Sequence, residues 1–360
     1  MSLTIIVGTG RCGSTMLSSM LHMHPEVLSL SEFWNLFLER EGNIPTHDMS
    51  GEQFWRKISD PAPSAYDGLV AAGIITNDVQ FPYHGRFDHV NGFPSVMHVL
   101  IRISDDPDLL YDKLAPEVSA WPRRPVAEHC RALFADLAGR LGRPAMVERT
   151  GGSLWHLPLL RQQFPEARFV FLYRNGPDTV LSMSRYPTYR LGVLNAIAEA
   201  ACGSSPEFQS LLDALPAEIR TASPDEFKGI ISPPFDKERF LAFPIPPTYY
   251  GWLWSDQIRT GTREIRQVRR DRWATLRYEH LLKDTRAALT GLADFIGVPA
   301  EPQWLDRACQ FVDPGRPRRA AAAFHPSDLA ELRSVCAAGT RAFELLESEH
   351  AASAEPAAVR

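Results

Sequence analysis

Residue types suited to binding an oxyanion are concentrated near the start of the chain. Residues 5–17, IIVGTGRCGSTML, run from an apolar stretch into three glycines, an arginine and a Gly-Ser-Thr exit. Glycines let the backbone approach a ligand closely, and successive backbone N–H groups at a helix N-terminus point towards one anion. These residues therefore predict a loop that binds phosphate or a related group.

The spacing of this loop is that of a Walker A motif without its lysine. Gly8 and Gly13 have the GxxxxG spacing, and Ser14 and Thr15 follow where that motif has Lys and then Ser or Thr. The cation lies inside the loop instead, as Arg11. The loop alone leaves open kinases, GTPase-like proteins, other phosphate binders and a glycine-rich turn without a ligand.

A magnesium-dependent P-loop kinase is one enzyme alternative. Such an enzyme needs a substitute for the missing lysine and carboxylates that hold Mg²⁺. The nearest carboxylate of that kind is Glu148, which follows the apolar segment PAMV and stands alone. A single carboxylate is weak evidence for a magnesium site, so the sequence does not favour a kinase.

A second pair of residues has the chemistry of a phosphate site. In residues 169–184, FVFLYRNGPDTVLSMS, Arg174 follows an apolar strand-like run and Ser182 comes eight residues later in the next helix. An arginine at the end of a strand can place its guanidinium fork on a phosphate, and the serine adds a hydroxyl. Each residue alone is also typical of a surface salt bridge or an ordinary helix position, so the prediction depends on the pair.

These segments resemble those of sulfotransferases that use 3′-phosphoadenosine-5′-phosphosulfate (PAPS). The segment GTGRCGSTML followed by HPEVLSLSEFW looks like the family's 5′-phosphosulfate loop, and FVFLYRNGPDTVLSMS resembles its 3′-phosphate element. Residues 277–299, RYEHLLKDTRAALTGLADFIGVP, resemble the family's strand, Tyr-Glu and helix segment. The resemblance is closest to the bacterial, Golgi and tyrosylprotein branches, which carry arginine in the loop.

The resemblance implies a donor site and a mode of transfer. A sulfuryl group would move in line from PAPS to an acceptor, leaving adenosine 3′,5′-bisphosphate (PAP), and Arg11 would stabilise the developing charge without a bound metal. Arg174 and Ser182 inherit the 3′-phosphate, and Tyr278 inherits the contact with adenine. The donor-binding loop residues would be Gly10, Arg11, Cys12, Gly13, Ser14 and Thr15.

The acceptor hydroxyl needs a general base, and Glu32 is the first candidate. It follows the strand-like EVLSL, where the arginine-loop branches carry a catalytic glutamate; the alternative is a first-turn glutamate that interacts with a helix dipole. His156 in WHLP is a second candidate, although it lies several residues beyond the position of the cytosolic branch's histidine. Arg149 stands where many members have lysine, and it is a secondary candidate for a contact with the sulfuryl group.

Alternating strands and helices predict an α/β fold of P-loop type. A parallel sheet flanked by helices follows from apolar strand candidates at residues 3–7, 26–30, 145–148, 168–173 and 273–276. Expected helices start at Gly13, cover residues 32–39, 126–141 and 154–164, start at residue 176, and follow the caps Asp284 and Ser327, the last ending near residue 346.

Two insertions are expected over the carboxyl edge of the sheet, forming an acceptor cap. Residues 41–125 and 187–270 are rich in proline, aromatic and polar residues, and we expect short helices and loops there within a single domain of residues 1–346. Residues 347–360 are expected to form a flexible tail. The aromatic segments QFPYHGRFDHVNGF and FPIPPTYYGWLW either line an acceptor pocket or pack the insertions onto the core.

Composition narrows the classes of function. The chain has 360 residues and a formal net charge of −5, which argues against a general nucleic-acid binder. Five scattered cysteines form no CxxC pair, and no apolar run approaches ~18 residues. The N-terminus also lacks the pattern of a targeting segment, so we expect a cytoplasmic protein without a membrane span.

The expected partner of the protein is a small-molecule, lipid or glycan acceptor. We expect the acceptor group to be a hydroxyl in preference to an amine. A non-catalytic nucleotide-binding protein is the remaining alternative.

Overall fold

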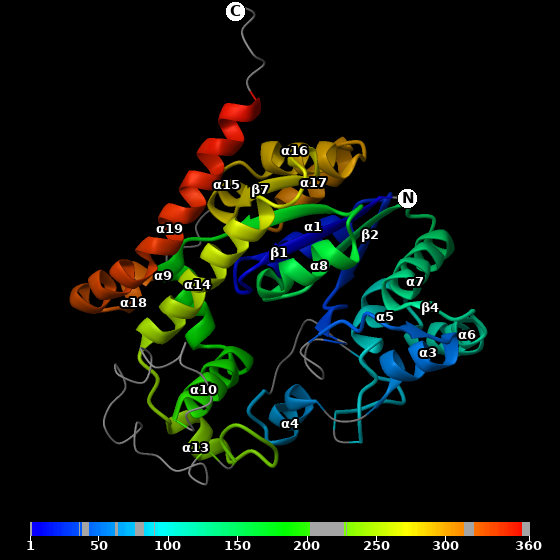
Figure 1. Ribbon diagram of the computed structural model, residues 1–360, viewed down its shortest axis with the longest axis horizontal. Coiled ribbons are helices and arrows are strands. Elements are labelled where there is room, and N and C mark those ends of the chain that lie inside the picture. The colour runs from blue at the N-terminus through cyan, green and yellow to red at the C-terminus, as the bar shows by residue number, and fades with distance from the viewer. Residues whose placement is uncertain are drawn as a thin grey trace, which may run out of the picture.

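The chain folds around a five-stranded parallel sheet with helices on both faces (Figure 1). The computed structural model describes residues 2–35, 37, 43–61, 64–75, 83–89, 91–201, 227, 229–312 and 320–354. The strand order is β2-β5-β1-β6-β7, which confirms the predicted α/β fold. The strands are β1 (Leu3–Gly8), β2 (Val27–Ser31), β5 (Ala145–Arg149), β6 (Arg168–Tyr173) and β7 (Trp273–Arg277).

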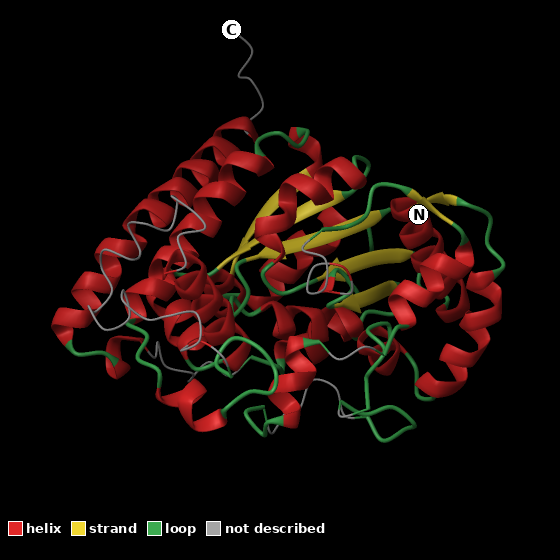
Figure 2. Ribbon diagram, turned by 60° about the horizontal axis from the view of Figure 1, so that its bottom comes forward, coloured by secondary structure: helices red, strands yellow, loops and turns green. Residues whose placement is uncertain are grey.

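The strands are apolar because most of the sheet is buried. Every residue of β1, β2 and β5 is buried, and alternate residues of β1 enter different cores: Ile5 and Val7 on one face, Ile6 on the other. Such continuous apolar runs are typical of parallel strands covered on both faces. All five strands run in one direction, so their carboxyl ends meet at a single edge (Figure 2).

Helices from distant parts of the chain cover the two faces. The Ile6 face packs against α1 (Ser14–His22), α15 (Tyr278–Lys283), α16 (Thr285–Ile296) and α17 (Pro302–Cys309). The larger core on the opposite face contains residues of α7 (Val126–Leu141), α8 (Leu157–Gln163), α9 (Gly176–Ser184), α14 (Pro247–Ile265) and α19 (Pro326–Ala354). Asp284 caps α16 by accepting from the backbone N of Ala287 at 3.0 Å, as the sequence predicts.

The first insertion contains the expected short helices and loops. Residues 41–42, 62–63, 76–82 and 90 of it lie outside the described part of the chain. Ser50 and Ser64 each begin a helix with a reciprocal capping box, which satisfies backbone donors that a helix leaves free. The elements are β3 (Asp48–Met49), α3 (Gly51–Ser59), α4 (Ala65–Ala71), α5 (Met97–Ile103), α6 (Pro107–Ser119) and β4 (Arg124–Pro125).

The second insertion is less separate from the core than its composition suggests. It contains α10 (Pro187–Ala201), α13 (Lys237–Ala242) and the single turn η4 (Arg270–Arg272), while residues 202–226 and 228 lie outside the described residues. The long helix α14 packs against α9 and α19, and its Tyr250 and Trp254 are buried. These two aromatic side chains therefore pack the core, as one of the two alternatives for that segment predicts.

The C-terminal helix continues further than the sequence indicates. Helix α19 begins at Pro326, one residue before the expected cap Ser327, and runs to Ala354 rather than ending near residue 346. Its Glu347 pairs with Arg277 at the end of β7, and Glu349 pairs with Arg266. The part of the expected tail at residues 347–354 is therefore helical, and residues 355–360 lie outside the described chain. No helix in the described ranges has the length and apolar character needed to cross a membrane.

Candidate functional site

Two positions in the loop between β1 and α1 have a backbone conformation that favours glycine. Gly10 and Gly13 have φ values of 72° and 91°, in the left-handed region that favours glycine. A Cβ on Gly10 would lie 1.4 Å from the Oη of Tyr189, and one on Gly13 would lie 2.2 Å from the ring of Tyr278. Both glycines are thus required by conformation and by space.

Arg11 is the point at which the two predicted phosphate elements meet. Its Nε lies 3.2 Å from the Oγ of Ser182, and its guanidinium lies 4.2 Å from the ring centre of Tyr186. Arg174 donates from Nη1 to the backbone oxygen of Arg11 at 3.0 Å. The strand-end arginine and the helix serine that the sequence pairs are therefore both bonded to the loop arginine.

Three of the residues predicted to bind the sulfuryl donor lie beside or beneath the loop: Arg174, Tyr278 and Cys12. The guanidinium of Arg174 stacks 4.8 Å from the ring centre of Tyr278, which is buried at the start of α15. The side chain of Cys12 is buried in the core beneath the loop, and this burial raises the pKa of its thiol. Only the backbone of Cys12 is therefore placed to serve a ligand.

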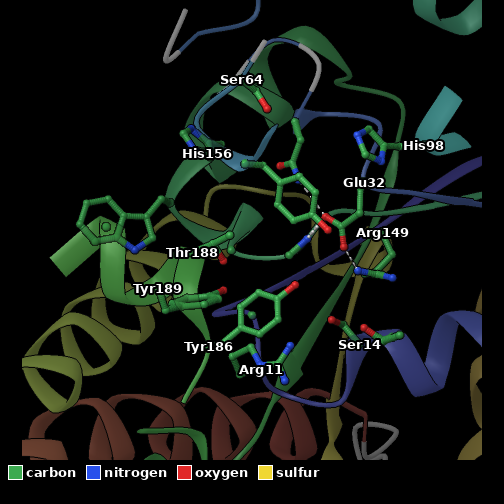
Figure 3. Close-up of a pocket in the computed structure, with 18 of the residues that line it drawn as sticks. Arg11, Ser14, Glu32, Ser64, His98, Arg149, His156, Tyr186, Thr188 and Tyr189 are labelled. Carbon is green, nitrogen blue, oxygen red and sulfur yellow. Dashed lines mark hydrogen bonds and ion pairs between the residues drawn. The ribbon is translucent and has the colours of Figure 1, made fainter. Parts of the chain in front are cut away.

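A cavity of about 560 Å³ opens at the carboxyl edge of the sheet (Figure 3). Its walls come from the loop, the ends of β2 and β5, the first insertion and helix α10. Arg174, Ser182, Tyr278, Cys12 and Gly13 are not among its lining residues. The predicted residues that line it are Gly10, Arg11, Ser14, Thr15, Glu32, Arg149 and His156.

Glu32 lines the cavity, and its carboxylate forms an ion pair and hydrogen bonds with neighbouring residues. It forms an ion pair with Arg149, whose side chain is only 2% exposed, and its Oε2 accepts from the Gly151 backbone N at 2.9 Å and from Asn35 Nδ2 at 3.0 Å. These contacts come from the end of β5, the strand next to β2, and from the turn that carries Glu32 itself. They fix the position of the carboxylate.

The backbone at Glu32 differs from the expected helix over residues 32–39. Ser31 is the last residue of β2, and its Oγ lies 2.6 Å from the Oγ of Ser18 in α1. Glu32 then has φ 60°, and it forms a turn with Phe33 and Trp34. The described helical residues of this segment are Asn35 and Phe37, so the helix starts later than expected and Glu32 lies before its first turn. Residues 36 and 38–39 lie outside the described residues.

His156, the second candidate base, lines the same cavity. It ends the short 3₁₀ helix η1 (Ser153–His156), and burial lowers the pKa of its imidazole. A neutral imidazole can accept a proton. The structure therefore brings both candidate bases to one cavity, together with the exposed side chain of Trp155.

Sequence reasoning missed several cavity residues. Tyr189 donates to the backbone oxygen of Thr9 at 2.8 Å and lines the cavity together with Tyr186. On the opposite wall, His98 projects from α5 (Figure 3), and the Asp67 carboxylate lies 2.5 Å from His89 Nδ1. Only Asp67 had a local signal, because Ser64 followed three residues later by an acidic residue is typical of a helix start.

The donors around the loop fit an anionic ligand. Arg149 Nε and Nη2 and Arg174 Nε are buried and have no partner among the described residues. Buried guanidinium donors normally find an acceptor, and an oxyanion supplies several. Within the described ranges, no group of three or more His, Cys, Asp or Glu side chains is arranged to hold a metal ion.

Comparisons with known proteins match this chain to sulfotransferases. A family model described as the sulfotransferase family matches residues 4–198, more than half of the chain. A sulfotransferase domain from the curacin biosynthetic pathway is 14% identical with a TM-score of 0.44, over 92% of this chain and 96% of that one. A sulfotransferase domain from the Synechococcus PCC 7002 olefin synthase is 16% identical with a TM-score of 0.42, over 97% and 94%.

Sulfotransferase STF9 from Mycobacterium avium is similar at 15% identity and a TM-score of 0.39, covering 92% of this chain and 74% of that chain. A search among curated proteins found no significant match. The family assignment therefore depends on the match over residues 4–198.

Proposed function

The chain belongs to the sulfotransferase family, and we propose that it transfers a sulfuryl group from PAPS to the hydroxyl of an acceptor, with PAP as the other product. One observation carries the proposal. Arg11, Glu32 and Arg149, from the ends of β1, β2 and β5, line a single cavity beside a glycine loop suited to an anion. The cavity thus combines a cation, a carboxylate and an anion-binding loop.

The donor would be held by the loop and by the residues bonded to it. The backbone N–H groups of the loop, with Ser14 and Thr15, suit the 5′-phosphosulfate. Arg174 and Ser182 are assigned to the 3′-phosphate, which requires that they exchange their present bonds with Arg11 for bonds to phosphate. The unpartnered Nε of Arg174 supports this assignment, and Tyr278 beside Gly13 is assigned to the adenine.

Arg11 and Glu32 divide the chemistry of the transfer. Glu32 takes the proton of the acceptor hydroxyl while that oxygen forms a bond to sulfur and the bond from sulfur to the phosphate oxygen breaks. Arg11 stabilises the charge that develops on the leaving oxygen, because its guanidinium stays charged and offers directed donors. Arg149 orients the Glu32 carboxylate, and its two unpartnered nitrogens are assigned to the sulfuryl oxygens.

The contacts of Glu32 leave a lone-pair position on its carboxylate that can accept a proton. A carboxylate has about four lone-pair positions, and Arg149, Gly151 and Asn35 account for three. We therefore place Glu32 ahead of His156 as the base. If His156 is the base instead, substitution of Glu32 by Gln leaves the rate of transfer largely intact.

The acceptor is proposed to be a ring-bearing molecule with hydroxyl groups. Aromatic walls favour flat or apolar rings, and hydroxyl or amide side chains orient polar groups. The cavity combines aromatic side chains (Tyr66, Phe93, Trp155, Tyr186 and Tyr189) with polar ones (Ser64, Ser95, Thr188 and Asn195).

Incubation with PAPS and a panel of phenols, sterols and glycans, followed by mass spectrometry, tests the function. The proposal predicts a product heavier by one SO₃ and release of PAP, with or without EDTA. Phosphorylated product from ATP, formed only with Mg²⁺, would instead identify a kinase. Binding of PAP without any sulfated product across the panel would favour a nucleotide-binding protein.

A further inference from the structure

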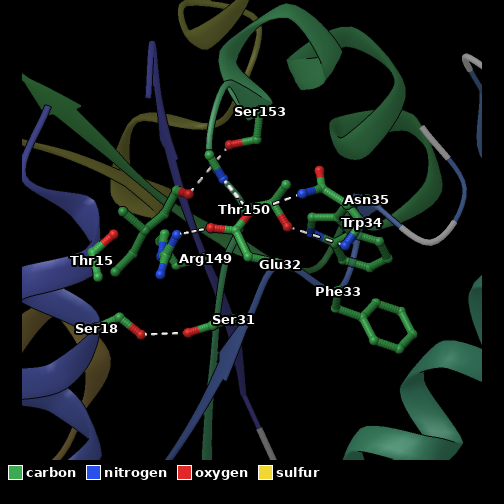
Figure 4. A network of polar contacts seen from close by, with 12 residues as sticks. Thr15, Ser18, Ser31, Glu32, Phe33, Trp34, Asn35, Arg149, Thr150 and Ser153 are labelled. Carbon is green, nitrogen blue, oxygen red and sulfur yellow. Dashed lines mark hydrogen bonds and ion pairs between the residues drawn. The ribbon is translucent and has the colours of Figure 1, made fainter. Parts of the chain in front are cut away.

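The turn that carries Glu32 is held by two side chains that do not line the cavity: Glu148 in β5 and Thr150 directly after it. The backbone N of Phe33 donates to Glu148 Oε1 at 3.2 Å. The backbone N of Trp34 donates to Thr150 Oγ1 at 3.1 Å (Figure 4). Thr150 also donates from its hydroxyl to Glu148 Oε1 at 2.5 Å. Two consecutive peptide groups after Glu32 are thus fastened to the strand that carries Arg149.

This turn needs such fastening because Glu32 is strained. Among the described residues, Arg11 and Glu32 are the non-glycine residues with positive φ, at 54° and 60°. Such a conformation persists only where surrounding contacts impose it, and it is common at functional sites. The backbone N of Glu32 also donates to the Arg149 oxygen at 2.8 Å. The bonds from β5 therefore hold the backbone that aims the Glu32 side chain.

Glu148 is an unusual acceptor for the Phe33 amide. Its side chain is fully buried, and its Oε2 has no hydrogen-bond partner among the described residues. Burial raises its pKa to about 8, and the nearby charge of Glu32 adds to this effect. At neutral pH Glu148 is therefore an uncharged acid, and the negative charge beside Arg149 belongs to Glu32.

We propose that Glu148 and Thr150 are positioning residues that hold the Phe33–Trp34 backbone and thereby aim the Glu32 carboxylate at the acceptor. The inference rests on the proposed role of Glu32 as the base. Neither side chain lines the cavity, so both act through Glu32. Ionisation of Glu148 would add a second negative charge beside the ion pair and would compete with Glu32 for Arg149.

Substitutions at Thr150 test the backbone contact. Thr150→Val keeps the shape but removes the acceptor for Trp34 N, and we expect kcat to fall by about 10- to 100-fold, as for other small misplacements of catalytic groups. KM for PAPS should stay within about twofold, because the donor loop is untouched, and Thr150→Ser should restore most of kcat. The matched control is Thr285→Val, which removes a buried hydroxyl bonded to Leu281 O at the far helix α16.

Glu148→Gln tests whether ionisation of the Glu148 carboxyl group affects transfer. Wild-type kcat should decline as the pH rises through about 8, where Glu148 ionises, and the variant should lack this decline. Carboxyl ¹³C NMR of glutamate-labelled protein gives a readout that needs no activity: one signal should titrate near pH 8 and be missing in Glu148→Gln.

The outcomes separate this inference from the proposed function. Loss of transfer in Glu32→Gln, together with wild-type kcat in Thr150→Val, would overturn the positioning role and leave the base assignment intact. Unchanged transfer in Glu32→Gln would overturn the base assignment and the positioning role with it. An alkaline decline that is identical in wild type and Glu148→Gln, or the absence of a glutamate titrating near pH 8, would also overturn the inference.

Discussion

The Nε of Arg11 lies 3.2 Å from the Oγ of Ser182, although 171 positions separate the two residues in the chain. This hydrogen bond joins the loop after β1 to helix α9, which follows β6, the neighbouring strand of the sheet. Arg174 at the start of the same segment bonds the backbone of Arg11. The two predicted phosphate elements thus form one unit, and a change in either should affect the binding of a doubly phosphorylated nucleotide.

Ser182→Ala should weaken the binding of PAP. The substitution removes a hydroxyl that is assigned to the 3′-phosphate, and a hydrogen bond to a charged group contributes about 1.5–3 kcal/mol. We expect Kd for PAP, measured by calorimetry, to rise at least about tenfold. Ser184→Ala is the matched control, because Ser184 lies in the same helix and bonds only the Leu181 backbone oxygen among the described contacts. Equal affinity in wild type and Ser182→Ala would remove the 3′-phosphate assignment.

Gly10→Ala should abolish PAP binding and destabilise the loop. The new methyl group would overlap the Oη of Tyr189, 1.4 Å away, and the φ of 72° adds strain. Gly139→Ala is the control: a Cβ there meets nothing within 4 Å, and alanine in a helix is about 0.5–1 kcal/mol more favourable than glycine. Thermal unfolding with and without PAP measures both effects. A ligand-induced rise in Tm that Gly10→Ala retains would contradict the proposed loop.

Tyr186→Leu should lower the rate of transfer more than Tyr186→Phe. The Arg11 guanidinium lies 4.2 Å from the Tyr186 ring centre, and such cation–π contacts contribute about 0.5–2 kcal/mol. Phenylalanine keeps the ring face, so its kcat should stay near the wild-type value, whereas leucine should cost about 2- to 30-fold. Steady-state kinetics with PAPS measure the difference. Equal kcat for the two variants would show that the ring does not position Arg11.

Folding stability should depend on pH through Glu148. Its pKa is raised from 4.5 to about 8 by burial, so the folded state holds this proton more tightly than the unfolded state. The associated stability is fully present below about pH 4.5 and is lost as the pH rises to about 8, at up to about 1.4 kcal/mol per pH unit. Urea unfolding of wild type and Glu148→Gln at pH 5 and pH 8.5 measures it. Relative to wild type, the free energy of unfolding of the variant should be higher at pH 8.5 than at pH 5. A difference between the two proteins that is the same at both pH values would contradict the raised pKa.

The sheet and the loop could be predicted from sequence because their signals are local. Continuous apolar runs mark the buried strands, and the glycine spacing marks the turn from Gly8 into α1. Helix α14 is harder, since prolines before it and aromatic residues within it resemble a loop-rich insertion. Its helical state depends on packing against α9 and α19, which sequence pattern does not reveal.

The conformation at Glu32 shows where local rules stop. Ser31 followed by an acidic residue is typical of a helix start, yet Ser31 bonds Ser18 in α1. The turn that follows is imposed by Glu148 and Thr150, more than a hundred residues away in the chain. Glu32 could be identified as a site residue by its place after β2, but the partners that orient it could not.

The central claim is tested most directly by comparing wild type with Glu32→Gln in one transfer assay. Each protein is given PAPS and the best acceptor of the panel, and the sulfated product is followed by mass spectrometry while PAP affinity is measured in parallel. The account predicts steady formation of a product carrying one added SO₃ in wild type, and a loss of at least about 100-fold in Glu32→Gln with PAP affinity retained. Wild-type turnover by Glu32→Gln, or no sulfated product from the wild-type protein, would contradict it.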